Sequence, residues 1–73
     1  MLLEELRRCV GGAYLSDLKM EPFNSRARRI AQAFAAAQYT AEEWNEALCY
    51  LVPGAASQPD AASARAALIL RPE

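Results

Sequence analysis

The stretch Tyr39-Thr40-Ala41-Glu42-Glu43-Trp44 carries the strongest local structural signal in the chain. Its Thr-x-x-Glu spacing is the capping-box pattern, in which the side chains of Thr40 and Glu43 each bind the other residue's backbone N–H. Tyr39 before the cap and Trp44 four residues after it have the spacing of a hydrophobic staple. The stretch therefore predicts a corner in the chain and a helix that begins at Ala41.

This helix is expected to bury one face and to end before Pro53. Trp44, Leu48 and Leu51 recur at spacings of four and three, which is the period of an amphipathic helix. Pro53 has no backbone N–H to continue a helix, and Gly54 after it favours a turn. Residues 53–59 are predicted to form a connecting loop.

The segment before the corner predicts a longer helix over residues 25–38. Ile30 and Phe34 are spaced by four, and alanine, the residue with the highest helix propensity, fills five of the seven positions from 31 to 37. Asn24 and Ser25 stand where side-chain oxygens cap the first free N–H groups of a helix.

The amino-terminal part of the chain predicts a further helix. Leu3, Leu6 and Val10 indicate an amphipathic first helix that ends at Gly11-Gly12. Residues 14–18 are expected to form a short helical turn, followed by irregular chain.

The last helix is expected over about residues 59–70. Pro59 suits a first helical turn, Asp60 complements the positive end of the helix dipole, and Pro72 prevents further extension. The alternative for Leu68-Ile69-Leu70 is a short strand.

These elements together predict an all-α fold. We expect residues 1–73 to form one domain, a small compact bundle of three main helices plus a short carboxyl-terminal helix. The side chains expected to meet in its core are Leu3, Leu6, Ile30, Phe34, Trp44, Leu48 and Leu51.

The residue inventory argues against most catalytic classes. The chain has no histidine, and so lacks the commonest general base and the commonest metal ligand. Its two cysteines are too few for a structural zinc site, which needs four Cys or His ligands. No nucleophilic triad or phosphate-binding loop is visible, so we predict a protein that is not an enzyme and holds no metal or cofactor.

The thiols and the amino-terminal sequence bear on the cellular compartment. Residues 1–8 mix acidic and basic side chains where a signal peptide has a long apolar stretch, and no segment reaches the apolar length of a membrane span. We therefore predict a cytoplasmic protein without membrane contact, in which Cys9 and Cys49 are reduced and pack as small apolar side chains. The alternative is a disulfide between them, which would require an oxidising compartment.

Charge is locally polarised although the net charge is only −1. Residues 22–39 contain three arginines and no acid, whereas residues 40–52 contain three glutamates and no base. Arg26, Arg28 and Arg29 are therefore a candidate anion-binding site near the start of a helix. The alternative is that they pair with acids, namely Asp17, Glu21, Glu4 or Glu5, or lie near the carboxyl end of the helix that begins at Ala41.

The two helices around the corner have the outline of a helix-turn-helix, but the charge pattern argues against its usual docking on DNA. The helix that would enter the major groove begins with Glu42, Glu43 and Glu46, which phosphates repel. Nucleic-acid association through the arginines is therefore the disfavoured alternative.

Aromatic and apolar residues outside the predicted stripes suggest an interaction surface. Tyr14, Leu18, Met20 and Tyr50 are candidate interface residues, since Tyr and Met are enriched at protein interfaces. A chain this short also gains little net stability from its own core. We therefore predict a non-enzymatic protein-protein interaction or regulatory module, which binds a protein partner or associates with itself as a dimer.

Overall fold

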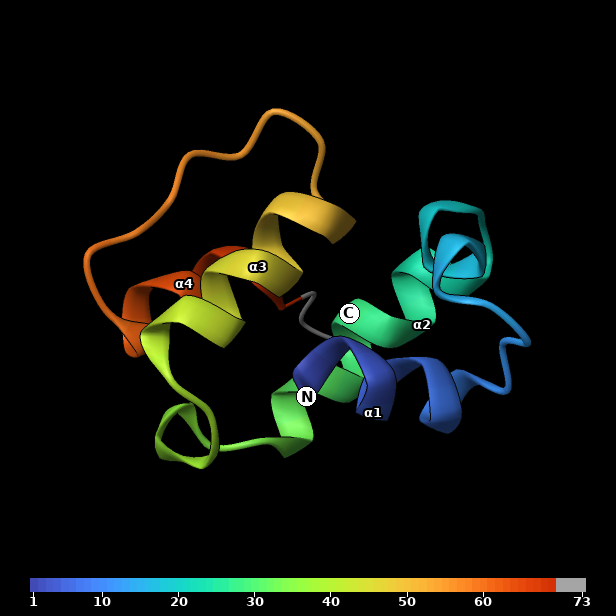
Figure 1. The fold of residues 1–73 in the computed structure, drawn as a ribbon, viewed down its shortest axis with the longest axis horizontal. Coiled ribbons are helices and arrows are strands. Elements are labelled where there is room, and N and C mark those ends of the chain that lie inside the picture. The colour runs from blue at the N-terminus through green and yellow to red at the C-terminus, as the bar shows by residue number, and fades with distance from the viewer. Residues whose placement is uncertain (70–73) are drawn as a thin grey trace.

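The computed structural model describes residues 1–69, and every regular element among them is helical (Figure 1). The α-helices are Leu2–Val10 (α1), Phe23–Ile30 (α2), Ala41–Leu51 (α3) and Ala61–Leu68 (α4), and 3-10 turns occupy Leu15–Lys19 (η1), Ala31–Ala33 (η2) and Ala36–Gln38 (η3). The predicted all-α fold is confirmed.

The first helix ends at the predicted glycines. Gly11 adopts the left-handed conformation with φ 76°, and its N–H donates to the carbonyl of Arg8. The N–H of Gly12 donates to the carbonyl of Arg7. A residue with a Cβ is disfavoured at this φ, so glycine sets the end of α1.

The corner before α3 forms as predicted, but only half of the predicted capping box is present, since among the described residues no hydrogen bond joins the Thr40 N–H to the Glu43 side chain. Thr40 is the N-cap, and its Oγ1 accepts a hydrogen bond of 3.2 Å from the N–H of Glu43. The rings of Tyr39 and Trp44 pack edge to face with centroids 6.1 Å apart, and Tyr39 packs in the same way on Phe34 at 5.9 Å. Trp44 is fully buried, so the staple fixes α3 against the core.

The Thr40 cap provides a first test of the fold. We expect Thr40→Ala to lower the free energy of unfolding by about 1 kcal/mol, because the N–H of Glu43 loses its acceptor. Urea denaturation followed by Trp44 fluorescence measures this change. Thr40→Ser retains a hydroxyl and should stay close to the parent protein, and equal stability of the alanine variant would contradict the capping role.

The predicted helix over residues 25–38 is wrong in its second half. Helix α2 begins earlier, at Phe23, and α-helical geometry stops at Ile30. Phe34 and Ala35 are extended, with ψ angles of 130° and 149°, and they separate η2 from η3. The side chain of Gln38 accepts a hydrogen bond from the N–H of Ala35, which stabilises the new turn.

Side chains from later in the sequence explain this break. Nε of Arg65 in α4 donates to the carbonyl of Phe34 at 2.7 Å, and its NH2 donates to the carbonyl of Gln32 at 2.9 Å. The indole N–H of Trp44 donates to the carbonyl of Ala36 at 2.9 Å. Long-range donors thus occupy backbone acceptors in the segment where the local sequence favours a helix.

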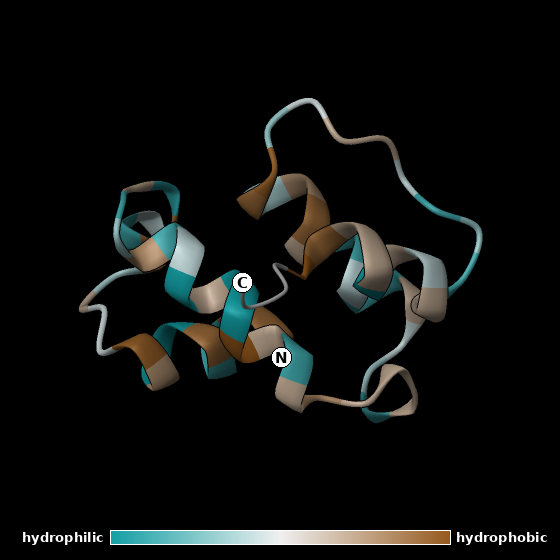
Figure 2. Ribbon diagram, turned by 180° about the vertical axis from the view of Figure 1, so that it is seen from behind, coloured by the Kyte–Doolittle hydropathy of each residue, from teal (hydrophilic) through white to brown (hydrophobic). Residues whose placement is uncertain are grey.

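The core lies where α1, η1 and α2 meet α3 and α4. Figure 2 shows the hydrophobic colour concentrated in α1 and α3, whereas α2, with its three arginines, is mainly hydrophilic. The buried side chains are Leu2, Leu3, Leu6, Leu18, Ala27, Ala31, Trp44, Ala47, Leu48, Leu51, Ala64 and Leu68. Ile30 and Phe34 were expected to be buried but are only partly covered, because the chain leaves the helical path at this point.

The last helix has a different start and end from those predicted. Asp60 is the N-cap rather than a first-turn residue, and its Oδ1 accepts a hydrogen bond of 2.7 Å from the N–H of Ser63. Leu68 is the last residue of α4, so the strand alternative is wrong for it, and Leu70 lies outside the described residues. The connection before α4 arches away from the helices (Figure 1), held by Asn45, whose side chain forms two hydrogen bonds with the backbone of Gln58.

The Asp60 cap predicts a dependence of stability on pH. Hydrogen bonds from the backbone N–H and side chain of Ser63 lower the pKa of Asp60 below its ordinary value of 3.8. Because the folded pKa is the lower one, the carboxylate stabilises the fold above pH 3.8, and this contribution is lost as the pH falls through the folded pKa. We therefore expect Asp60→Asn, which keeps a capping oxygen but cannot titrate, to lose less stability than the parent between about pH 5 and pH 2.

Urea denaturation at a series of pH values measures this difference. Asp60→Ala serves as the comparison that removes both the cap and the titrating group. A parallel decline in the stability of the parent and Asp60→Asn would contradict the assignment.

Candidate functional site

An open pocket of about 260 Å³ lies between the η1–α2 corner and the carboxyl end of α3. Its lining residues are Lys19, Glu21, Asn24, Cys49, Tyr50, Leu51 and Pro53. Tyr50 and Pro53 provide apolar surface, whereas Lys19 and Glu21 provide one charge of each sign. The pocket thus brings apolar surface and two opposite charges together at one open site.

Asn24 fixes the two sides of this pocket relative to one another. Its Nδ2 donates to the carbonyl of Leu18 at 2.9 Å and to the carbonyl of Leu51 at 2.8 Å. The prediction that Asn24 caps the second helix is therefore wrong, because its amide links η1 to the end of α3 instead. The carbonyl of Leu51 is one of those left free at a helix end, and Asn24 satisfies it.

Lys19 covers one face of the pocket residue Tyr50. The ammonium nitrogen lies 4.6 Å from the centroid of the Tyr50 ring, which is cation–π geometry. At an exposed position such a contact contributes about 0.5–1 kcal/mol. It orients the phenol at the pocket edge while Lys19 itself stays exposed.

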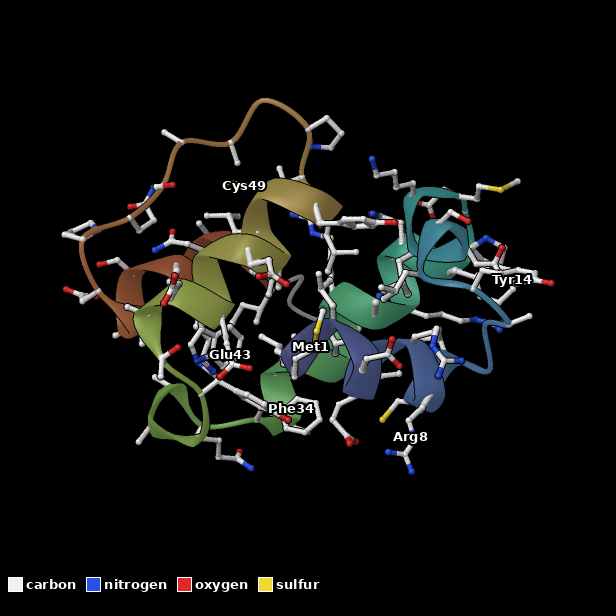
Figure 3. All side chains as sticks on the ribbon, in the orientation of Figure 1. Met1, Arg8, Tyr14, Phe34, Glu43 and Cys49 are labelled. Carbon is white, nitrogen blue, oxygen red and sulfur yellow. The ribbon has the colours of Figure 1, made fainter. Side chains whose placement is uncertain are left out.

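Of the predicted interface residues, some lie at the surface and one lies in the core. Tyr14 is 72% exposed and Met20 is 62% exposed, and Figure 3 shows Tyr14 pointing away from the helices at the edge of the molecule. Leu18, in contrast, is fully buried, so its assignment to a surface is wrong. Leu15 and Leu18 are one turn of η1 apart and both pack on the core, where η1 meets α1 and α2.

The three candidate anion-binding arginines do not form one cluster. Nε of Arg28 donates to the carbonyl of Leu68 at 2.8 Å, so Arg28 closes the end of α4. Arg26 and Arg29 are exposed, and neither has a hydrogen bond or ion pair with a residue that the structure describes. They lie three apart on α2, and therefore on neighbouring positions of one face.

Three of the four acids considered as partners of these arginines are engaged elsewhere, and the fourth, Glu21, lines the pocket. Glu4 pairs with Arg7 at 3.0 Å and Glu5 pairs with Arg8 at 3.1 Å, both within α1. Asp17 accepts hydrogen bonds from the N–H groups of residues 13 and 14. Two of the three arginines thus project into solvent without these neighbours.

The carboxylates form no metal centre in the described part of the chain, and the phenol of Tyr39 is only partly buried. No group of three His, Cys, Asp or Glu side chains among residues 1–69 is placed to hold a metal ion. Partial burial raises the pKa of Tyr39, and the nearby Glu5 and Glu43 raise it further, so this phenol stays protonated. Its hydroxyl has no role in the pocket, which lies at the other end of α3.

The two cysteines are both exposed and unpaired. Cys9 lies near the end of α1, whereas Cys49 lines the pocket. The thiol of Cys49 lies 3.7 Å from the carbonyl of Ala55. The predicted reduced thiols therefore agree with the structure, but the prediction that they pack as small apolar side chains is wrong.

Exposure of both thiols predicts their reactivity. We expect the native protein, purified without oxidant, to react with two equivalents of a thiol reagent at a rate close to that of the urea-unfolded chain. Cys9→Ser and Cys49→Ser should each remove one equivalent. A native protein that reacts only after treatment with a reductant would contradict the free-thiol state.

Comparison with known proteins gives no relative: no family model, curated protein or solved structure matches this chain. Among residues 1–69, no helix has both the length and the apolar character required to cross a membrane.

Sequence reasoning did not identify most of the pocket. Lys19, Asn24, Cys49 and Pro53 come together only because η1 packs near the end of α3. One signal was available, since Lys19 is the single lysine of the chain and directly precedes the exposed Met20. The contact with Tyr50 depends on tertiary structure, and no local pattern predicts it.

Proposed function

We propose that this protein is a non-enzymatic protein-protein interaction module that binds its partner at the pocket between η1 and α3. The observation that supports this proposal is the 62% exposure of Met20, which stands between the pocket residues Lys19 and Glu21. A flexible thioether adapts to varied partner surfaces, and methionine and tyrosine are enriched at interfaces.

The chemistry of the pocket indicates what kind of partner it suits. An apolar partner side chain would pack against Tyr50, Pro53 and Met20. Lys19 on one side favours an acid in the partner, and Glu21 on the other favours a base, so the opposite charges would orient the bound segment. We further propose that the protein works in the cytoplasm, where the exposed thiols stay reduced.

Affinity capture with a matched pair of variants tests this function. The full chain, Met20→Asp and Ser57→Asp are immobilised and exposed to lysate from the native source, and each retained protein is purified and titrated against all three. Both substitutions add one negative charge at an exposed position, but residue 57 lies in the loop before α4. We expect Met20→Asp to weaken binding by about tenfold or more and Ser57→Asp to leave it unchanged.

Two results would overturn the proposal. The first is a partner that binds Met20→Asp and the parent chain equally well. The second is retention of nucleic acid alone, with an affinity that falls steeply with salt and is lost in Arg26→Glu/Arg29→Glu, because this would favour the alternative of phosphate binding by α2.

A further inference from the structure

The segment between α2 and α3 is held in a conformation that its own sequence does not favour. Residues 31–38 contain five alanines and two glutamines, yet the segment is divided into two 3-10 turns by the extended residues Phe34 and Ala35. Alanine and glutamine favour α-helix over extended chain. A continuous helix from Phe23 to Gln38 is therefore a competing local structure.

The side chains of Arg65 and Trp44 oppose this helix in the folded chain, and Arg65 occupies two of its carbonyls. In a continuous helix the carbonyls of Gln32 and Phe34 would accept from the N–H groups of Ala36 and Gln38. In the structure both carbonyls accept from Arg65 instead. The break and the docking of α4 therefore depend on each other.

The break also separates two parts of the molecule that pack internally. Helix α1 lies against α2 and η1, and α3 lies against α4, with residues 31–40 passing between the two pairs along one edge (Figure 1). Each part contributes large buried side chains to the shared core, among them Leu6 and Leu18 from the first and Trp44 and Leu48 from the second. Separating the parts would expose these side chains unless an equivalent surface covered them.

We propose that residues 31–38 are a hinge through which two copies of this chain exchange their α3–α4 parts. In the exchanged dimer residues 23–38 form one helix of sixteen residues, about 24 Å long, which carries α3 away from its own α1. The α3–α4 part of the second copy then covers Leu6 and Leu18 with the same contacts that the monomer makes. The partner is a second copy of this chain, because its α3–α4 part has the same sequence and therefore the same complementary surface.

A proline at position 35 is compatible with the closed monomer but not with the continuous helix. Ala35 has a φ of −73°, and Phe34 before it has a φ of −97° and a ψ of 130°, so the break accepts proline at this position. In the continuous helix a proline would remove a hydrogen bond and clash with the preceding turn, a change of about a hundredfold in the helix equilibrium. We expect Ala35→Pro to fold as the closed monomer. Its association constant for dimerisation should be lower than that of the parent chain by at least this factor.

Ala35→Pro also removes the hydrogen bond from the Ala35 N–H to Gln38, and a control accounts for this loss. Gln38→Ala removes the same bond but permits the helix. It should therefore form at least as much dimer as the parent chain.

Substitution of Arg65 should act in the opposite direction. Arg65→Ala leaves two carbonyls unsatisfied in the closed monomer, whereas the continuous helix satisfies them, so the dimerisation constant should rise by about tenfold. Arg29→Ala is the matched control, since this exposed arginine has no hydrogen bond or ion pair with the described residues.

Refolding each protein at micromolar and millimolar concentration, followed by light scattering on the separated species, measures the dimer fraction. Cα chemical shifts of residues 34 and 35 then report the conformation of the hinge. We expect helical shifts in the dimer and extended-chain shifts in the monomer. The proposal is overturned if the parent and Arg65→Ala are both monomeric throughout, if Ala35→Pro dimerises as readily as Gln38→Ala, or if the dimer keeps residues 34 and 35 extended. Should Arg65→Ala fail to fold, the comparison of Ala35→Pro with Gln38→Ala still decides.

Discussion

The hydrogen bonds from Arg65 to the carbonyls of Gln32 and Phe34 are the interaction on which the chain's path depends. A backbone carbonyl away from water needs a donor, and a helix supplies one locally. Here the donor comes from a residue more than thirty positions later. This contact turns the chain toward the corner at Thr40 and so determines where α3 lies.

The parts of the fold that the sequence predicted are those fixed within a few residues. The glycine end of α1 and the Thr40 cap of α3 each require a contact across four or five residues at most. The helix over residues 25–38 was predicted by the same kind of local argument, and locally the argument was sound. It failed because the side chains of Arg65 and Trp44 donate to carbonyls in this segment. The positions of these two side chains follow only from the completed fold.

The candidate site shows the same division between local and long-range information. Tyr14 and Met20 were recognised as candidates from their type, and their exposure follows from their places at the ends of a short turn. Leu18 was misassigned because it was grouped with Tyr14 and Met20 by residue type and closeness in sequence, whereas the packing of η1 against α1 and α2 buries it. The pocket itself depends on the hydrogen bonds of Asn24 to two carbonyls in different elements, one of them 27 residues away.

Short helices also explain a structural use for arginine in this chain. Each α-helix leaves carbonyls without intrahelical donors at its carboxyl end, and a fold of several short helices has many of them. Arg7 donates to the carbonyl of Gly12 after α1, Arg28 to that of Leu68 at the end of α4, and Arg65 to two carbonyls after α2. The planar guanidinium can serve two such acceptors at once, which the point charge of a lysine does less well. The arginines of α2 that have no such task, Arg26 and Arg29, are therefore distinguished from Arg28 by chain geometry rather than by residue type.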